Sequence, residues 1–479
     1  MQVVLLAGPT VLAFRAGGFF DGPRAVAAVT VWALVGVSAV AFERPLPRGN
    51  PGRVAVAALA GLCAWVAVGS SWAPLGGPAQ DDLIRDLLFL GGLLLAITAW
   101  RRRDELRLVE PGLAAGTMIV VGYGLAGRLL PDLVEQQTSI SAEGRLDQPL
   151  TYWNAMGALA AIGLVLCIRL SGDETRLPSL RIAAAAAAVP LGAGIYLSFS
   201  RGALAALAAG LVVLLLLAPS REQLTAAGIA VAAGALAAVV ASFLPGVESL
   251  DGSDSDRRID GLVMLAALVV LAGMAAFATR RLVRSGLSST PAAPGAVLRR
   301  RGLVAAVALV LIVGAPLTAA AFDDSGENAR GDASAQRLSE LGSNRYDYWE
   351  VALGQFAGDP LRGGGPGSFE VEWRREREIE ESVGDAHSLP IETAAELGLV
   401  GLALLGLLVG AVGVGARRSW EADPVLATGP VAALSVWAVH SCLDWDWEMP
   451  ALTLLAVVLA GALLAAEVEG RELSGGPAG

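Results

Sequence analysis

Residues 385–410 read DAHSLPIETAAELGLVGLALLGLLVG, and no charged side chain follows Glu396 in this stretch. A helix needs about 20 apolar residues to cross the hydrocarbon core of a bilayer. The apolar run that extends from Ser388 to about residue 413 has this length. Backbone N–H and C=O groups find no water in lipid, so such a run must be helical. The stretch therefore predicts a transmembrane helix with a polar segment at its entrance.

Similar apolar runs recur along the whole chain and predict about fourteen transmembrane helices. Hydrophobic residues make up 54% of the 479 residues and charged residues 17%, whereas a soluble domain has about 25% charged residues. The mean hydropathy is +0.59. The predicted spans are 2–14, 25–42, 54–74, 87–100, 109–131, 151–170, 181–199, 202–219, 224–246, 261–279, 302–322, 388–413, 425–442 and 449–466. The expected fold is all-α, a polytopic bundle of about 12–14 transmembrane helices in a single integral membrane domain, 1–479.

The arginines give the expected orientation of this bundle. The chain has no lysine, so all 35 basic residues are arginines. Arginines cluster in the connectors after even-numbered spans, which the positive-inside rule assigns to the cytoplasm. They are Arg44, Arg48, Arg53, Arg101, Arg102, Arg103, Arg107, Arg280, Arg281, Arg284, Arg299, Arg300, Arg301, Arg417 and Arg418. We therefore expect both termini in the cytoplasm.

The connectors on the other side are mostly acidic. The longest, 323–386, holds fifteen acids and seven arginines and is predicted to be a large extracytoplasmic loop with short helices. The first connector is an exception, because Arg15 and Arg24 outnumber Asp21 there.

Composition and motifs exclude several functions. The net charge is −10, and no basic patch is interleaved with aromatic residues, so nucleic-acid binding is not expected. The three cysteines are scattered and show no metal-ligand spacing, and no cofactor is predicted. Neither a chain of buried ionisable residues nor paired broken helices indicates transport. Polar residues gather instead at the outer ends of the helices, which favours chemistry at the outer membrane face.

Two candidate segments lie in the first half of the chain. The first, GRLDQPLTYWNAMGAL at 144–159, contains Arg145, Tyr152 and Asn154. Taken alone, it is better explained by a headgroup arginine, an interfacial aromatic pair and a helix cap. The second, LSFSRGALAAL at 197–207, contains Ser200 and Arg201 at a tight outer turn. An arginine there can bind phosphate in a bidentate manner, or its side chain can extend to the lipid phosphates.

A third segment, SNRYDYWEVALGQFAGDPLRGGGPGSF, covers residues 343–369. Tyr346, Trp349, Leu353 and Phe356 form one apolar stripe at helical spacing, which predicts a helix with Arg345 at its start and the Asp359-Pro360 pair at its end. The stripe is expected to lie on the membrane surface or to pack on the bundle. The glycine run that follows matches no phosphate-binding pattern.

The fourth segment is the entrance of the opening stretch, where His387 precedes Ser388. His387 is one of two histidines, and histidine transfers protons near neutral pH. It can also be a headgroup-level residue with no task. The other histidine, His440, is interpreted as structural or as a support for the site, near Asp444 and Asp446.

At these residues the chain resembles the O-antigen ligase and polymerase superfamily of bacterial membrane glycosyltransferases. The signature of that superfamily is a His followed by Asn, Ser or Gln, then nine residues, then Gly-x-x-Gly. In this chain it corresponds to His387-Ser388 and Gly398–Gly401. Further correspondences are Arg345, Trp349, the Pro-Leu-glycine run ending at Phe369, the Tyr152-Trp153-Asn154 triplet and the Ser200-Arg201-Gly202 triplet. The chain departs from the family at Trp153, where a proline is usual, and in having more than the family's twelve or so spans.

The resemblance implies transfer of a glycan from undecaprenyl diphosphate to an acceptor hydroxyl at the outer face of the cytoplasmic membrane. It implies that Arg201 and Arg345 bind the diphosphate and that His387 activates or orients the acceptor. Direct transfer would invert the anomeric centre, and two fixed guanidinium groups would make a metal unnecessary. Arg145, Tyr152, Asn154, Ser200, Trp349 and Ser388 are then candidate substrate contacts. The acceptor is a glycan, a lipid or a protein.

Two other functions stay open at this point. A flippase or transporter of lipid-linked sugars would move its substrate without forming a bond. The other is a non-catalytic protein of cell-envelope assembly that has lost the activity. The intact His387, Arg201 and Arg345 argue against this second function. Ligases and polymerases share these motifs, so the sequence does not separate them.

Overall fold

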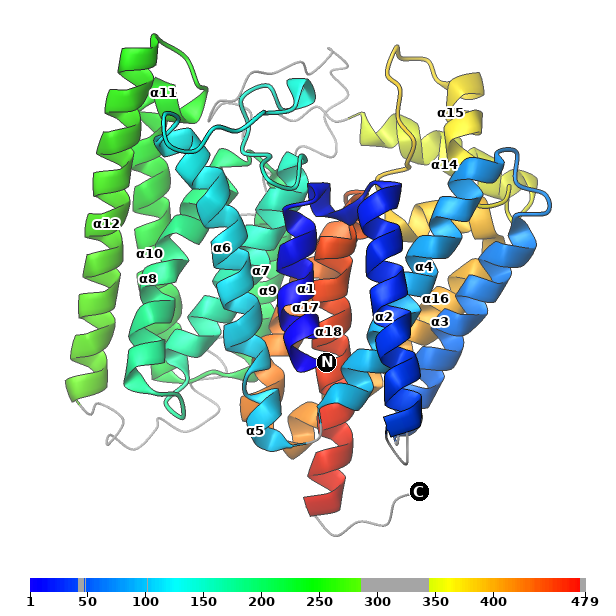
Figure 1. Cartoon of the computed structure of the whole chain (residues 1–479), viewed down its shortest axis with the longest axis horizontal. Coiled ribbons are helices and arrows are strands. Elements are labelled where there is room, and N and C mark those ends of the chain that lie inside the picture. Colours follow the sequence, from blue (N-terminus) through cyan, green and yellow to red (C-terminus); the bar gives the residue numbers. More distant parts are fainter. Residues whose placement is uncertain (42–46, 48, 101, 286–343, 474–479) are drawn as a thin grey trace. The chain divides into compact units, whose positions relative to one another are not determined.

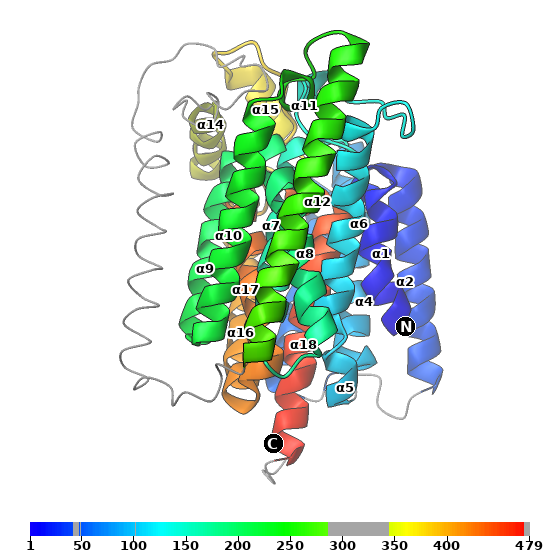
Figure 2. The ribbon, with the colours of Figure 1, turned by 90° about the vertical axis from the view of Figure 1, so that its left-hand side faces the viewer.

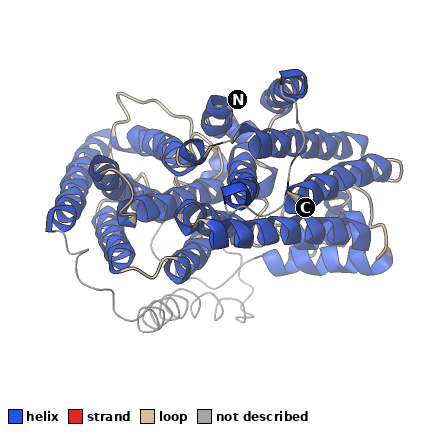
Figure 3. Ribbon diagram, turned by 90° about the horizontal axis from the view of Figure 1, so that it is seen from below, coloured by secondary structure: helices blue, strands red, loops and turns tan. Residues whose placement is uncertain are grey.

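The computed structural model describes residues 1–41, 47, 49–100, 102–285 and 344–473. In these ranges the chain forms helices joined by turns and loops, without a strand (Figure 3). Within them, nine helices are long and apolar enough to cross a membrane by length and composition. The prediction of a polytopic helical membrane protein is confirmed.

Each predicted span within the described ranges coincides with a helix, whereas the span 302–322 lies outside them, as do residues 323–343 of the large loop. Several boundaries were wrong: the spans predicted at 261–279 and 388–413 belong to the longer helices Asp254–Ser285 and Leu389–Ala422, and the span predicted at 87–100 belongs to a helix that already begins at Gly76. The acids Asp81, Asp82 and Asp86 made this segment look like a connector, but they lie on the helix. Asp81 and Asp82 line a polar cavity of the first unit.

The backbone contacts divide the chain into two compact units, and the first holds Met1–Arg107, Ser343–Ala427 and His440–Gly479. Its long helices pack in sequence-distant pairs, such as α3 with α16 and α4 with α18 (Figure 1). Its elements are α1 (Gln2–Ala13), η1 (Ala16–Gly18), α2 (Asp21–Ala41), α3 (Asn50–Gly69), α4 (Gly76–Ala99), α5 (Arg103–Leu106), α14 (Arg345–Gly358), α15 (Phe369–Glu376), α16 (Leu389–Ala422), η5 (Asp446–Glu448) and α18 (Pro450–Leu473).

The second unit holds Leu108–Gly342 and Thr428–Val439, the latter from the middle of α17 (Pro424–Ser441). Its core is α7, whose apolar window is wholly buried against α6, α8, α9 and α10. Figure 2 shows α6, α8, α10 and α12 running alongside one another. The elements are α6 (Val109–Leu129), η2 (Ile140–Ala142), α7 (Trp153–Gly172), α8 (Pro178–Leu197), α9 (Arg201–Leu217), α10 (Arg221–Ser242), α11 (Pro245–Glu248) and α12 (Asp254–Ser285). Small residues permit close approach, as at Gly192 and Gly234.

Helix α16 is broken near its start, at Gly398, whose φ is 62° and ψ −161°. The carbonyl groups before the break lose their helical partners and accept other donors. Ala395 O accepts from Gly364 N at 3.0 Å and Glu396 O from Gly365 N at 2.9 Å. The indole nitrogen of Trp65 donates to Leu397 O at 2.9 Å. After the break, Leu399 N donates to Pro360 O at 2.8 Å.

The glycine run therefore packs on the broken helix. A Cβ atom at Gly363 would lie 2.4 Å from the Glu396 carbonyl carbon, and one at Gly398 would lie 2.5 Å from the Leu361 carbonyl carbon. Glycine is needed at both positions because no side chain fits between these backbones. The Glu396 carboxylate adds bonds from Gly367 N and Phe369 N, each at 3.0 Å. These amides serve the fold and do not form a phosphate cradle.

We predict that Gly398→Ala lowers the free energy of unfolding by about 1–3 kcal/mol, because alanine is strained at this φ and its Cβ meets the backbone of Leu361. Thermal unfolding of the detergent-purified protein measures the effect. Gly406→Ala is the matched control on the same helix, since a Cβ there meets no heavy atom within 4 Å. Its melting temperature should equal or exceed that of the native chain. Equal melting temperatures for both variants would contradict the role of the break.

Candidate active site

His387 lies in the segment that joins α15 to α16, partly exposed, with a φ of 55°. Its Nδ1 lies 2.9 Å from the carbonyl oxygen of Asp385. A carbonyl oxygen only accepts, so Nδ1 carries the proton and donates it. In the neutral ring this tautomer leaves the lone pair on Nε2. A left-handed backbone at a residue other than glycine is uncommon and costs energy, and such strain concentrates at functional sites.

Tyr348 of α14 supports the His387 ring, with 5.1 Å between the ring centroids. The Tyr348 ring meets Trp373 of α15 edge-on at 5.0 Å. Glu381 joins these parts: its carboxylate accepts from the Tyr348 hydroxyl at 2.7 Å, and its carbonyl accepts from the Trp373 indole at 2.8 Å. Asn344, at the start of α14, donates to the same carboxylate at 2.6 Å. The large loop thus holds the histidine through a packed and hydrogen-bonded core.

Arg345, the first residue of α14, forms an ion pair with Asp444, at 2.5 Å between Nη2 and Oδ2. Asp444 is fully buried, and its other oxygen accepts from Trp445 N at 2.9 Å. A second buried pair, His440 and Asp446, lies close by, with 2.8 Å between Nδ1 and Oδ2. The ion pair with the buried Asp444 holds the Arg345 guanidinium in place. Removal of either partner would leave an uncompensated charge.

The pKa of His387 is lowered from its ordinary 6.5, chiefly because burial disfavours the imidazolium. The Asp444 carboxylate acts in the opposite direction, and the Arg345 guanidinium lowers the pKa further. At pH 7 the ring is therefore neutral and able to accept a proton.

A polar cavity of about 330 Å³ opens beside this segment, in the same unit. Its lining combines many carboxylates with two arginines and two phenylalanine rings. The lining residues include Phe19, Phe20, Arg85, Asp385, Glu392 and Glu448. Arg85, on α4, binds Glu448 at 2.5 Å and Asp82 at 2.7 Å.

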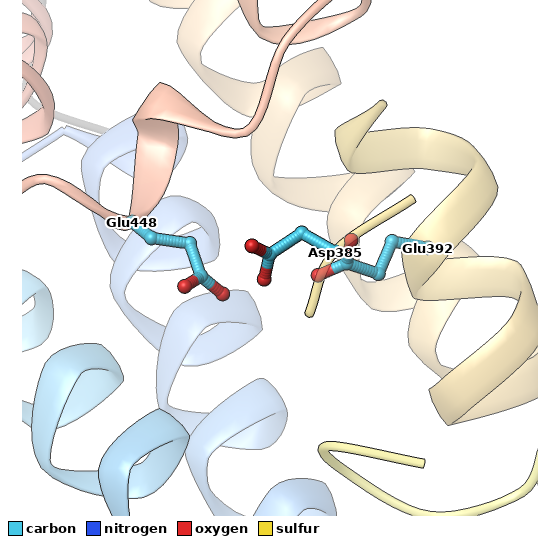
Figure 4. A group of neighbouring side chains, drawn as sticks. All are labelled: Asp385, Glu392 and Glu448. Atoms are coloured by element: carbon cyan, nitrogen blue, oxygen red, sulfur yellow. The ribbon is translucent and has the colours of Figure 1, made fainter. Parts of the chain in front are cut away.

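Three of these carboxylates converge: oxygen atoms of Asp385, Glu392 and Glu448 lie within 4.8 Å of one another (Figure 4). Glu392 accepts from Ala386 N at 2.6 Å, next to His387. Burial raises the pKa of Glu448 to about 7, and burial together with Glu448 raises that of Asp385 well above its ordinary value. Carboxylate oxygens at this spacing suit a hard divalent cation, and protonation is the other way to relieve their repulsion.

The second unit brings Arg145, Tyr152 and Asn154 to one end of α7. Arg145 is buried, bonds to Ala142 O at 2.9 Å and to Glu143 at 3.0 Å, and lies 3.9 Å over the Trp153 ring. Asn154 donates to the Tyr152 hydroxyl at 2.9 Å. These contacts describe an ordered entrance to α7.

Arg201 begins α9 directly after the short connector from α8, as predicted. Its neighbour Ser200 is buried and caps the helix, accepting from Ala203 N at 3.2 Å. Phe199, just before, has a φ of 48°, and Thr151 before the Tyr152 motif has a φ of 67°. With His387, a strained residue therefore stands at or beside three of the motifs.

The remaining candidates belong to the first unit. Ser388 is buried at the start of α16. Trp349 meets Tyr346 edge-on, and its buried indole N–H has no acceptor among the described residues. The helix predicted for the apolar stripe is present. Of the two placements predicted for the stripe, packing on the bundle does not hold for Tyr346 and Leu353, and lying on the membrane surface stays a prediction. Tyr348 and Ala352 are buried, whereas Tyr346 and Leu353 are exposed.

Sequence analysis missed the acidic cavity and the roles of Tyr348 and Glu381. Glu392 and Glu396 offered a signal, since two acids four residues apart at the start of an apolar helix are costly in lipid and mark functional positions. Asp385 and Glu392 stand in the same stretch, whereas Glu448 comes from a distant segment, so the convergence of Glu448 with the other two had no sequence signal.

A comparison with protein families gives a match. Residues 186–406 match a family model described as O-antigen ligase. The matched segment contains Arg201, Arg345 and His387 and begins after Asn154. A search of the curated proteins found no match. This match supports the predicted resemblance to the O-antigen ligase and polymerase superfamily, over 221 of the 479 residues.

We predict that Tyr348→Phe lowers the free energy of unfolding by about 1 kcal/mol, because it removes the hydroxyl bond to Glu381 and keeps the ring under His387. The control is Tyr346→Phe on the same helix, whose ring is 46% exposed and whose hydroxyl has no partner among the described residues. Thermal unfolding in detergent compares the two. A control that loses as much as Tyr348→Phe would refute the role of this bond.

Proposed function

We propose that this chain, which carries an O-antigen ligase domain, is a membrane glycosyltransferase that uses a lipid diphosphate donor. It moves a glycan from undecaprenyl diphosphate to an acceptor hydroxyl, as ligase or polymerase, in cell-surface polysaccharide biosynthesis. The observation that carries the proposal is the position of His387, whose Nδ1 lies 2.9 Å from Asp385 O, in one unit with Arg345, which forms an ion pair with the buried Asp444.

His387 is the general base of the proposed reaction. The acceptor oxygen attacks the anomeric carbon of the glycan and transfers its proton to Nε2 of His387. The bond between the anomeric carbon and the diphosphate oxygen breaks, and its electron pair leaves with the diphosphate. One direct displacement of this kind inverts the anomeric centre. A positioned base contributes about 10²–10⁴ in rate.

Arg345 and Arg201 stabilise the leaving diphosphate in this proposal. The diphosphate gains negative charge as the bond breaks, and fixed guanidinium groups lower the energy of that state. Asp444 supports the orientation of Arg345 through the 2.5 Å ion pair. Arg201 is the first residue of α9 and follows the turn in which Phe199 has a strained, positive φ. With two such groups no divalent metal is required.

The acidic cavity is assigned to the acceptor. Its carboxylates repel a diphosphate, whereas hydroxyl groups of a sugar pair well with carboxylate and carboxyl oxygens. Phe19 and Phe20 add apolar ring faces to the lining. Asp385 lines this cavity with its side chain and holds His387 with its carbonyl group. Trp349, Tyr152 and Asn154 are further proposed contacts for the glycan.

The charge pattern supports the proposed location. The chain would be an integral membrane protein of a bacterial cytoplasmic membrane, with both termini inside. The site and the loop 323–386 would face outward. This orientation follows from the arginine-rich connectors at the opposite ends of the helices. A lipid-linked donor would then reach the site from the outer leaflet.

We predict that the purified chain releases undecaprenyl diphosphate from a lipid-linked oligosaccharide only when a glycan acceptor is present. His387→Ala should lower the rate by about 10²–10⁴, and Arg345→Ala and Arg201→Ala should also lower it, with EDTA having no effect. Arg374→Ala, an exposed arginine on α15, is the control and should keep the native rate. Product length separates a polymerase from a ligase.

Two outcomes would count against this proposal. Absence of release with every acceptor, together with movement of the lipid across liposomes that survives His387→Ala, would show a transporter instead. Loss of activity in EDTA, restored by a divalent cation, would overturn the metal-free mechanism and direct attention to Asp385, Glu392 and Glu448.

We further predict the pH dependence of kcat/KM. A base works in its deprotonated form, so the rate falls as pH falls through the pKa of His387. Because burial lowers that pKa, the midpoint of the acidic limb should lie below 6.5 and full activity should persist at pH 7. The residual rate of His387→Ala should lack this limb. A midpoint above 6.5 would contradict the assignment.

A further inference from the structure

An apolar groove of about 680 Å³ runs along α1 in the first unit. Its walls come from α1, the start of α2, the middle of α4 and the first turns of α18. Representative lining residues are Leu5, Gly8, Val26, Leu95, Leu454 and Val458. None of the proposed catalytic or substrate-binding residues lines it, so this groove is a separate feature of the unit.

Small residues create the space in the groove. A Cβ atom built at Gly8 of α1 or at Gly22 of α2 would meet no heavy atom within 4 Å. Helix α1 has twelve residues, which gives about 18 Å of length against a hydrocarbon core of about 30 Å. Val11 and Val26, which line the groove, are 62% and 68% exposed. The groove therefore presents an aliphatic trough to the surrounding lipid.

Arg15 is the one charged residue in the lining, and it follows the C-terminal end of α1. Arg15 is exposed, and its side chain forms no hydrogen bond or ion pair with any residue in the described ranges, whereas its backbone bonds to Leu12 and Gly18. Arg24, in the same connector, is different: it is 3% exposed and bonds to Asp21 at 2.7 Å and to Asp81 at 2.5 Å. The ion pairs explain the position of Arg24, whereas the Arg15 side chain has no polar partner within the described part of the chain.

We propose that the groove binds an anionic phospholipid of the surrounding membrane, with one acyl chain along α1 and the phosphate at Arg15. An aliphatic trough with one cation at its end is complementary to an acyl chain that ends in a phosphate. A guanidinium binds phosphate through two parallel N–H bonds. The proposal does not depend on the glycosyltransferase activity.

The test is native mass spectrometry of the full-length protein released from nanodiscs of equal phosphatidylglycerol and phosphatidylcholine. We expect one phosphatidylglycerol retained per native chain. Arg15→Gln should reduce this retention about tenfold, the factor that corresponds to 1.4 kcal/mol, and should abolish the preference for phosphatidylglycerol. Gly8→Phe should fill the trough and reduce the retention of both lipids.

Two control variants match these changes. Arg417→Gln removes an arginine whose side chain is 79% exposed and which lies outside the groove. Gly406→Phe adds a ring at a position where a Cβ meets no heavy atom within 4 Å. Both should retain the lipid. Gly8→Leu, with a smaller side chain, serves if Gly8→Phe does not elute as a single species.

Equal retention in the native chain, Arg15→Gln and Gly8→Leu would overturn the proposal. Displacement of phosphatidylglycerol by an equimolar amount of undecaprenyl diphosphate, dependent on Arg15, would also overturn it, because the groove would then be a donor site. Neither result depends on whether glycan transfer occurs, so failure of this proposal and failure of the proposed function are distinguishable.

Discussion

The need to give every backbone group a partner at the break of α16 fixes the arrangement of the first unit. Lipid offers no hydrogen bonds, so a broken helix at membrane depth persists only where protein groups replace the lost ones. Here they come from the glycine run and from Trp65 of α3. The run in turn places the start of α15 through Glu396. The position of the loop core, and of His387 against it, follows from this packing.

The buried charges of the first unit are the second feature that needs an explanation. Arg85 contacts Asp82 and Glu448, and Arg345 contacts Asp444. Further carboxylates surround them, so acids outnumber arginines in the cavity lining. Ionised groups are costly to bury unless they are paired, protonated or bound to a cation. A surplus of buried carboxylates over arginines does not stabilise the fold. It therefore favours a role for these carboxylates in binding a substrate.

Residues with a strained backbone stand at or beside three of the sequence motifs. Thr151, Phe199 and His387 each adopt a positive φ, and each stands at or beside a segment that the sequence had singled out. Close packing surrounds two of these residues, since Phe199 is buried and Tyr348 packs against the His387 ring, whereas Thr151 is exposed. Sites that must act on a substrate in one geometry commonly store strain of this kind. Within each unit, the motifs are therefore held by their surroundings.

The sequence by itself determined the helical membrane fold, because the length and polarity of an apolar run decide whether it crosses lipid, and both are local properties. It also determined the positions of α14 and of the turn before Arg201, since helical spacing and short connectors are local signals. The tertiary structure alone decided what each polar group contacts. Arg345 and Asp444 are 99 residues apart in the chain, and Trp65 and Leu397 are 332 apart. Such pairings depend on how the helices pack, and no local pattern in a single sequence encodes them.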